Sequence, residues 1–128
     1  MVLNFVLLDT DVLIDFLRGN PKAIALVNKY SDRIILSTIV VTELYAGVKG
    51  KPELIVLDNL IAVFDLIAVT PKIARTAGLY KRDYYKSHGL SIADAIIAAS
   101  CELEKLELKT LNVKHYPMIK NLKPAYKK

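Results

Sequence analysis

The segment 2–8, VLNFVLL, is an almost unbroken run of apolar residues that ends at Asp9. Such a run predicts a strand whose two faces are both buried. Strands of this kind belong to parallel sheets that helices cover on both sides, so this segment favours an α/β fold.

Helices and short strands alternate along the rest of the chain. Helices are predicted over residues 9–17, 21–30, 38–47, 52–62, 70–87 and 91–105, and further strands over 33–36, 66–69 and 106–111. This alternation indicates a three-layer α/β/α sandwich around a mostly parallel sheet of four to five short strands. We expect a single domain over residues 1–128, with a basic and partly irregular tail from about residue 117.

The composition indicates the cellular compartment of the chain and the kind of partner it binds. Its net charge of +5 weakly favours a polyanionic partner. No apolar run approaches the roughly 18 residues of a membrane span, and the start has no basic signal-peptide region. The single cysteine, Cys101, lies among small apolar residues and is predicted to be a core thiol in a reducing compartment. We therefore expect a cytoplasmic protein without a membrane anchor.

The predicted helix 52–62 carries apolar residues nearly all the way round. This pattern indicates burial on two sides. The second side is either the interior of the same chain or a partner protein.

Three acidic residues stand in apolar surroundings. Asp9 follows the first strand, Glu43 lies within the segment IVVTELY, and Asp94 lies within IADAIIAA. An isolated carboxylate in such a setting costs several kcal/mol unless it is protonated, paired or bound to a cation.

Each of the three also has a structural explanation. Asp9 could cap the first helix, Asp94 follows Ser91 at capping-box spacing, and Glu43 could form a buried ion pair. One hard cation at the carboxyl edge of the sheet would account for all three together, because Mg²⁺ and Mn²⁺ prefer oxygen ligands.

Carboxylates around Mg²⁺ in a basic protein favour phosphodiester chemistry. A stripe on the helix 70–87 could hold a nucleic-acid backbone, although a solvated face explains it as well. The stripe consists of Lys72, Arg75, Arg82 and Lys86.

Four segments, in this order, resemble the motifs of the PIN-domain family and span nearly the whole chain: LDTDVLID (8–15), STIVVTEL (37–44), LSIADAIIAA (90–99) and TLNVKHY (110–116). The resemblance implies a metal-dependent nuclease with Asp9, Glu43 and Asp94 as its acidic core. It further implies that Thr10 and Asn112 support the site and that Asp11 assists it.

Small stand-alone PIN domains resemble toxin ribonucleases of the VapC type. The resemblance therefore implies an RNA substrate, Mg²⁺ or Mn²⁺ as cofactor, a VapB-like antitoxin laid along a groove, and a homodimer. One position departs from the family pattern, since His115 stands where a fourth acidic residue is common. This change leaves open an alternative, a catalytically weakened PIN-like module that binds RNA or protein.

Two other enzyme classes fit less well. A phospho-receiver domain would use Asp9 and Asp11 as its acidic pair, but its phospho-accepting residue would be Asp58, which lies within a predicted helix. A phosphatase using Asp9 as nucleophile would need further lysine and acidic motifs that a chain of 128 residues leaves little room for.

Overall fold

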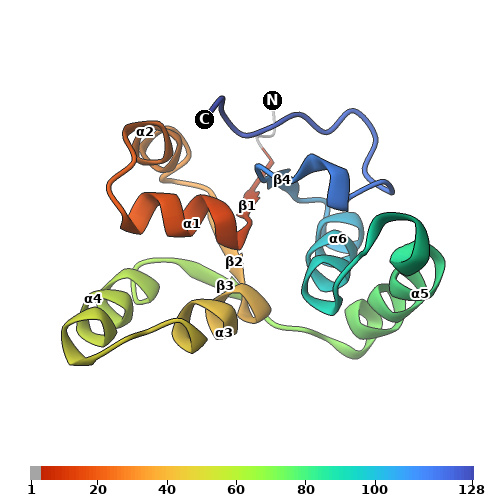
Figure 1. The fold of residues 1–128 in the computed structure, drawn as a ribbon, viewed down its shortest axis with the longest axis horizontal. Helices are drawn as coiled ribbons and strands as arrows, with labels where there is room; N and C mark the ends of the chain where they lie inside the picture. The colour runs from red at the N-terminus through yellow and green to blue at the C-terminus, as the bar shows by residue number, and fades with distance from the viewer. Residues whose placement is uncertain (1–3) are drawn as a thin grey trace.

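The computed structural model describes residues 4–128 and contains a sheet of four parallel strands. The strands are β1 (Val6–Leu8), β2 (Ile34–Ser37), β3 (Asp65–Ile67) and β4 (Glu107–Lys109), in the order β3-β2-β1-β4. The predicted α/β/α sandwich is confirmed, since helices flank the sheet on both sides (Figure 1).

Within residues 4–128, six α-helices and one short 3₁₀ helix connect and extend the strands. They are α1 (Thr10–Leu17), α2 (Pro21–Lys29), α3 (Thr38–Ala46), α4 (Lys51–Ile61), α5 (Pro71–His88), α6 (Ile92–Glu104) and η1 (Val113–His115). In Figure 1, α1 and α2 lie to one side of the strands and α5 and α6 to the other, with α3 and α4 below α1.

The central strand β1 explains why the chain begins with an apolar run. Val6, Leu7 and Leu8 are each 0% exposed, because β2 and β4 pair with both edges of β1 and helices cover its faces. The strand is shorter than predicted: Asn4 and Phe5 are exposed and outside it, and residues 2 and 3 lie outside the described residues. The other strands are likewise three or four residues long.

Side-chain caps set the starts of most helices where the sequence predicts them. Asn20, Ser37, Thr70 and Ser91 each accept a hydrogen bond from a backbone N–H in the first turn of the following helix. Gly89 ends α5 with φ at 61°, the left-handed conformation that glycine adopts without strain. The turn it makes allows α6 to pack back along α5, where the two helices share a small apolar core that includes Ile73, Leu90 and Ala99.

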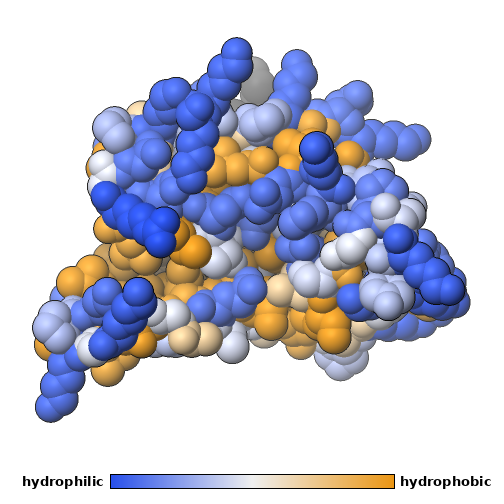
Figure 2. Space-filling view, in the orientation of Figure 1, coloured by the Kyte–Doolittle hydropathy of each residue, from blue (hydrophilic) through white to orange (hydrophobic). Residues whose placement is uncertain are grey.

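Of the two alternatives left open for the helix predicted over residues 52–62, burial of its second side inside the chain is wrong. Leu57 is the only buried residue of α4, whereas Ile55 and Val56 are 59% and 57% exposed. The helix packs on the rest of the chain along one side only. Figure 2 shows apolar side chains gathered over the lower left of the molecule, where α3 and α4 lie.

The segment after η1 packs on the domain instead of extending from it. Ile119, Leu122 and Tyr126 pack against the main apolar core. The Ala125 N–H donates to the carbonyl of Thr110 at 2.8 Å, and the Tyr126 hydroxyl donates to Asp15 Oδ2 at 2.7 Å. The basic tail predicted from residue 117 is therefore part of the fold.

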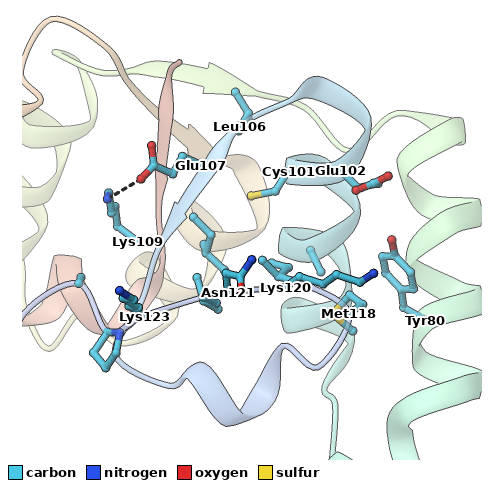
Figure 3. A pocket seen from close by; sticks show the side chains of 16 residues that line it. Tyr80, Cys101, Glu102, Leu106, Glu107, Lys109, Met118, Lys120, Asn121 and Lys123 are labelled. Atoms are coloured by element: carbon cyan, nitrogen blue, oxygen red, sulfur yellow. Dashed lines mark hydrogen bonds and ion pairs between the residues drawn. The ribbon is translucent and has the colours of Figure 1, made fainter. Parts of the chain in front are cut away.

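The C-terminal segment, α6 and β4 line a cleft of about 760 Å³ (Figure 3). Cys101 contributes to its wall and is only 7% exposed. Burial raises the pKa of the Cys101 thiol to about 12, so the thiol is not ionised at neutral pH. The prediction of a core cysteine is confirmed. Across residues 4–128, the helices are too short or too polar to cross a membrane.

Replacing Tyr126 by Phe should lower the free energy of unfolding at pH 7 by about 1 kcal/mol, because the buried Asp15 carboxylate loses a donor. The Tyr126 hydroxyl, with help from Lys128, holds the pKa of Asp15 below its ordinary 3.8. The contribution is therefore present above about pH 4 and is lost as the pH falls below it. Urea unfolding at pH 7 and pH 3 measures both values, with Tyr85→Phe, at a 55% exposed tyrosine, as control. An equal loss at the two pH values would contradict the assignment.

Candidate functional site

Asp9 lies at the carboxyl end of β1, where the central strand gives way to α1. It is 5% exposed, and both its oxygens accept hydrogen bonds. Oδ1 accepts from the Thr10 N–H at 2.7 Å, while Oδ2 accepts from the Thr110 hydroxyl at 2.8 Å and the Tyr116 hydroxyl at 2.7 Å. The carboxylate therefore caps α1 and at the same time contacts the segment that follows β4.

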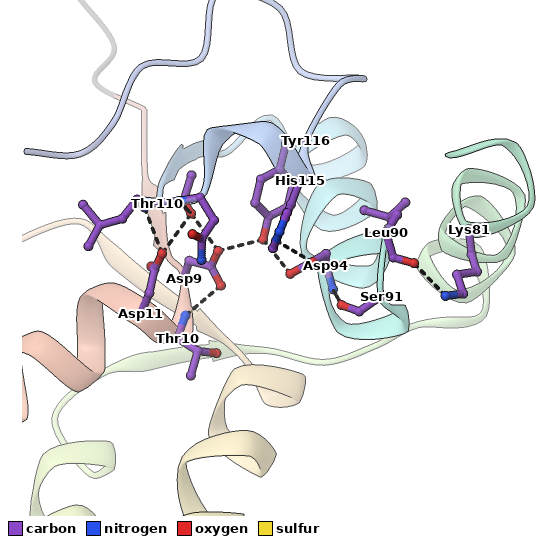
Figure 4. A network of polar contacts seen from close by, with 12 residues as sticks. Asp9, Thr10, Asp11, Lys81, Leu90, Ser91, Asp94, Thr110, His115 and Tyr116 are labelled. Carbon is purple, nitrogen blue, oxygen red and sulfur yellow. Dashed lines mark hydrogen bonds and ion pairs between the residues drawn. The ribbon is translucent and has the colours of Figure 1, made fainter. Parts of the chain in front are cut away.

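Asp94 lies in the first turn of α6 and faces Asp9. The Tyr116 hydroxyl is 3.1 Å from Asp94 Oδ1, and His115 Nδ1 is 3.2 Å from Asp94 Oδ2. Ser91 caps the helix by accepting from the Asp94 N–H at 3.0 Å, so half of the predicted capping box is formed. The Asp94 side chain itself is turned toward Tyr116 and His115 (Figure 4).

Glu43 reaches the same edge of the sheet from α3. Its Oε1 accepts from the Thr10 hydroxyl at 2.8 Å, so Thr10 joins Glu43 to the first turn of α1. Glu43 is exposed, which corrects the prediction that its apolar neighbours in sequence bury it. Val40 and Leu44 are buried, whereas Glu43 lies beside this buried face and lines a groove together with Leu44.

Asp11 ties α1 to the end of β4. Its Oδ2 accepts from the Leu111 N–H at 3.0 Å and its Oδ1 from the Val12 N–H at 2.7 Å. Burial, with the nearby Asp9 carboxylate, raises the pKa of Asp11 to about 6. Both of its oxygens are occupied by backbone donors, which indicates a supporting role.

The electrostatics of Asp9 follow from its burial. Burial raises the pKa of Asp9 above its ordinary value, and the neighbouring Asp94 carboxylate raises it further. Hydrogen bonds from Tyr116, Thr110 and Thr10 act in the opposite direction. Burial is therefore the main obstacle to the charge of Asp9, and three hydrogen bonds offset part of it.

Within residues 4–128, no three His, Cys, Asp or Glu side chains are close enough together to form a ready metal site. The donor chemistry at the edge of the sheet nevertheless fits a hard divalent cation. Asp9 and Asp94 are both within hydrogen-bonding distance of one hydroxyl, and carboxylate oxygens are the ligands that Mg²⁺ and Mn²⁺ prefer. Burial, and to a smaller extent the Asp94 carboxylate, raises the pKa of Asp9, and a cation between the two carboxylates would favour their charged forms.

The other residues predicted for the site, Asn112 and the basic residues of α5, contribute less to this network or lie outside it. The Asn112 side chain is exposed and forms no capping hydrogen bond within the described part of the chain. Its backbone N–H reaches the network by donating to Thr110 Oγ1 at 3.1 Å. All four basic residues of the predicted stripe lie exposed on α5. Arg82 Nε donates to Asp83 at 2.9 Å, so its charge is already paired.

Two residues of the network were missed by the sequence analysis as site residues. Thr110 is 0% exposed and Tyr116 is 1% exposed, and both donate to Asp9 across more than 100 positions of sequence. They are the first and last residues of the segment TLNVKHY, which follows the strand next to β1. The position of this segment, directly after a strand at the carboxyl edge of the sheet, could have identified Thr110 and Tyr116 as site residues.

The PIN domain model matches residues 6–116, which includes every residue of the network from Asp9 to Tyr116. The chain belongs to the PIN domain family. Asp9 and Asp94 lie at the edge where the strands end, and Glu43 contacts Thr10 there. In parallel α/β sheets, ligands typically bind at this edge.

Curated relatives of this PIN domain come from Mycobacterium tuberculosis. The chain is 37% identical over 124 residues to Ribonuclease VapC19, covering 94% of this chain and 98% of the relative. It is 38% identical over 123 residues to Ribonuclease VapC10, covering 94% and 92%. Among solved structures, a toxin–antitoxin complex from Klebsiella pneumoniae contains a chain that superposes with a TM-score of 0.81 at 26% identity, covering 94% of this chain and 98% of that one.

Replacing Thr110 by Val should destabilise the metal-free protein by about 2 kcal/mol, because the buried Asp9 carboxylate loses a hydroxyl donor without losing packing volume. Thr110→Ser keeps the hydroxyl, loses one methyl group and should cost about 1 kcal/mol. Chemical denaturation with chelator present compares the two. A valine variant as stable as the serine variant would show that this hydrogen bond contributes little.

Proposed function

We propose that this PIN domain is an Mg²⁺- or Mn²⁺-dependent endoribonuclease and the toxin of a VapBC-type pair. The observation that carries the proposal is the meeting of Asp9 and Asp94 at the carboxyl edge of the sheet, where a single tyrosine hydroxyl lies between them. The similarity to two VapC ribonucleases over almost the full length of the chain supports the same activity.

Asp9, Glu43 and Asp94 would hold the cation. When bound, it would orient a water molecule, lower the pKa of that water and offset charge developing on the scissile phosphate. The chain supplies the rigidity around it: Thr110 and Tyr116 fix the Asp9 carboxylate, and Thr10 directs Glu43 toward the first turn of α1. Glu43 is the most exposed of the three and faces the groove described below, so it has the freedom to close on a cation.

The basic face of α5 would hold the RNA backbone. Lys72, Arg75 and Lys86 are exposed on this helix, and Tyr85 nearby is 55% exposed with the Lys81 ammonium 4.7 Å from its ring centroid. Exposed cations beside an aromatic ring suit a phosphate backbone and an unpaired base.

A second candidate is a PIN module that binds RNA or protein without cleaving it. The observation in its favour is His115, whose Nδ1 lies 3.2 Å from Asp94 Oδ2 where the family commonly has a carboxylate. In that arrangement the imidazole occupies one oxygen of a proposed metal ligand. Metal-dependent cleavage by the unmodified chain separates the two candidates.

The proposed antitoxin would lie in the groove between α1, α3 and α4. This groove has a volume of about 670 Å³, and its apolar lining includes Leu17, Val56 and Leu57. Glu43 also lines it, so an occupant would run directly past a proposed metal ligand. The solved toxin–antitoxin complex with a similar chain supports a partner of this kind. A homodimer stays a prediction, for which the 76% exposed Val63 offers apolar surface.

Asp94→Asn should reduce RNA cleavage by about 100-fold or more, because the site loses one of its two closely spaced charges. The assay uses mixed structured RNAs with Mg²⁺, with Mn²⁺ and with chelator. Asp32→Asn, which changes an exposed aspartate paired with Arg33, should cleave like the unmodified chain.

Cleavage that persists in chelator or in Asp94→Asn would overturn the proposed mechanism. A folded chain that binds RNA, binds no Mn²⁺ and leaves every RNA intact would favour the binding module instead.

Neutralising the basic face should weaken RNA binding without affecting the metal site. The double change Arg75→Gln and Lys86→Gln should reduce the steepness of the salt dependence of RNA affinity by about one to two phosphate contacts. Lys51→Gln, an exposed lysine at the start of α4, serves as control. Fluorescence anisotropy at several salt concentrations measures the slopes, and identical slopes would remove α5 from the RNA-binding surface.

The groove is tested by two neighbouring exposed residues of α4. Val56→Lys places a charge in the groove, whereas Ile55→Lys adds the same charge outside its lining, and both side chains are more than half exposed. A tagged chain expressed from its native locus should copurify with a protein that blocks its RNA cleavage. Val56→Lys should lose that inhibitor and Ile55→Lys should keep it. Equal retention by both variants would place the inhibitor elsewhere.

A further inference from the structure

Tyr116 places one hydroxyl between two carboxylates of the proposed metal site. Its oxygen is 2.7 Å from Asp9 Oδ2 and 3.1 Å from Asp94 Oδ1, and Figure 4 shows the side chain reaching in from the 3₁₀ turn. The residue is 1% exposed and belongs to the main apolar core. Because its ring is buried and its N–H bonds back to the Val113 carbonyl at 3.1 Å, the hydroxyl has little freedom to move.

The arrangement has more acceptors than hydrogens. A phenol carries one hydrogen, so Tyr116 donates to only one of the two carboxylates at a time. One of the two carboxylate oxygens therefore receives no hydrogen from Tyr116 at any moment. A cation bound there would satisfy that oxygen in place of a second hydrogen-bond donor.

The other contacts of the two carboxylates hold each of them separately. Asp9 is held by Thr10 and Thr110, and Asp94 by His115. Among the described hydrogen bonds, Tyr116 alone contacts both carboxylates. A phenylalanine at this position would fill nearly the same volume. The substitution therefore removes the hydroxyl and keeps the packing of the ring.

We propose that Tyr116 is a positioning residue that sets the spacing of Asp9 and Asp94 and thereby the affinity of the site for a divalent cation. The inference rests on the proposed metal-dependent function and adds a residue to it. Groups that orient metal ligands typically change metal affinity by about 10- to 100-fold when they are removed.

The test is Mn²⁺ binding to the full chain by calorimetry, with RNA absent. Tyr116→Phe should weaken Mn²⁺ binding by about 10-fold or more. Tyr126→Phe is the matched control, since its hydroxyl also donates at 2.7 Å to a buried aspartate, Asp15, outside the proposed site. Both variants should lose stability, and only Tyr116→Phe should lose Mn²⁺ affinity.

Steady-state cleavage adds a second readout. Raising the Mn²⁺ concentration should restore most of the kcat of Tyr116→Phe, with the KM for RNA unchanged, because the hydroxyl acts on the metal site. A third readout needs no variant: Mg²⁺ added to the unmodified chain should shift the ¹³Cζ resonance of Tyr116 and leave that of Tyr126 in place.

The outcomes separate this inference from the function on which it rests. If the unmodified chain binds Mn²⁺ and Asp94→Asn does not, but Tyr116→Phe binds as tightly as the unmodified chain, the inference is wrong and the metal site stands. An unshifted Tyr116 resonance on Mg²⁺ binding overturns it as well, and does so even if Tyr116→Phe fails to fold. If the unmodified chain binds no Mn²⁺, the proposed function and the inference both fall.

Discussion

Burying a carboxylate at the end of the central strand is the constraint on which the rest of the site depends. Asp9 stands at the junction of β1 and α1, where three fully buried residues precede it, and burial disfavours its charge. Three donors offset part of this cost: one comes from the next residue, and two come from the segment after β4. The strand pairing of β4 beside β1 is what brings that segment within reach.

Buried aspartates near both ends of α1 also hold the segment after β4 against the domain. Two tyrosines from the region after β4 donate to two aspartates at opposite ends of α1: Tyr116 to Asp9 and Tyr126 to Asp15. These contacts join residues 107 and 111 positions apart, so α1 is held against the C-terminal segment at both of its ends. The proposed metal site and the packing of the tail are thus parts of one network. A change in the C-terminal segment that loosens η1 should weaken the hydrogen bond from the Tyr116 hydroxyl to Asp9.

The sequence predicted the sandwich and the six helices because apolar periodicity is a local property of each segment. It predicted that Asp9 and Asp94 lie near each other because the carboxyl ends of parallel strands share one edge of the sheet. The sequence did not predict the exposure of helix side chains, because that exposure depends on which other elements pack against the helix. Glu43 has apolar neighbours in sequence yet is exposed. For α4 the apolar pattern left open whether its second side meets the interior or a partner, and this side is exposed in the chain alone. Tyr116 lay outside such reasoning, since its role depends on a register between β1 and β4 that no local pattern specifies.

The central claim is that Asp9 and Asp94 form a cation site at the carboxyl edge of the sheet. Crystals of the unmodified chain soaked in Mn²⁺, with diffraction measured at the manganese absorption edge, test it most directly. The account predicts an anomalous peak within about 2.0–2.3 Å of carboxylate oxygens of both residues. A fully soaked crystal with no peak there, or with peaks only at surface carboxylates elsewhere, would contradict it.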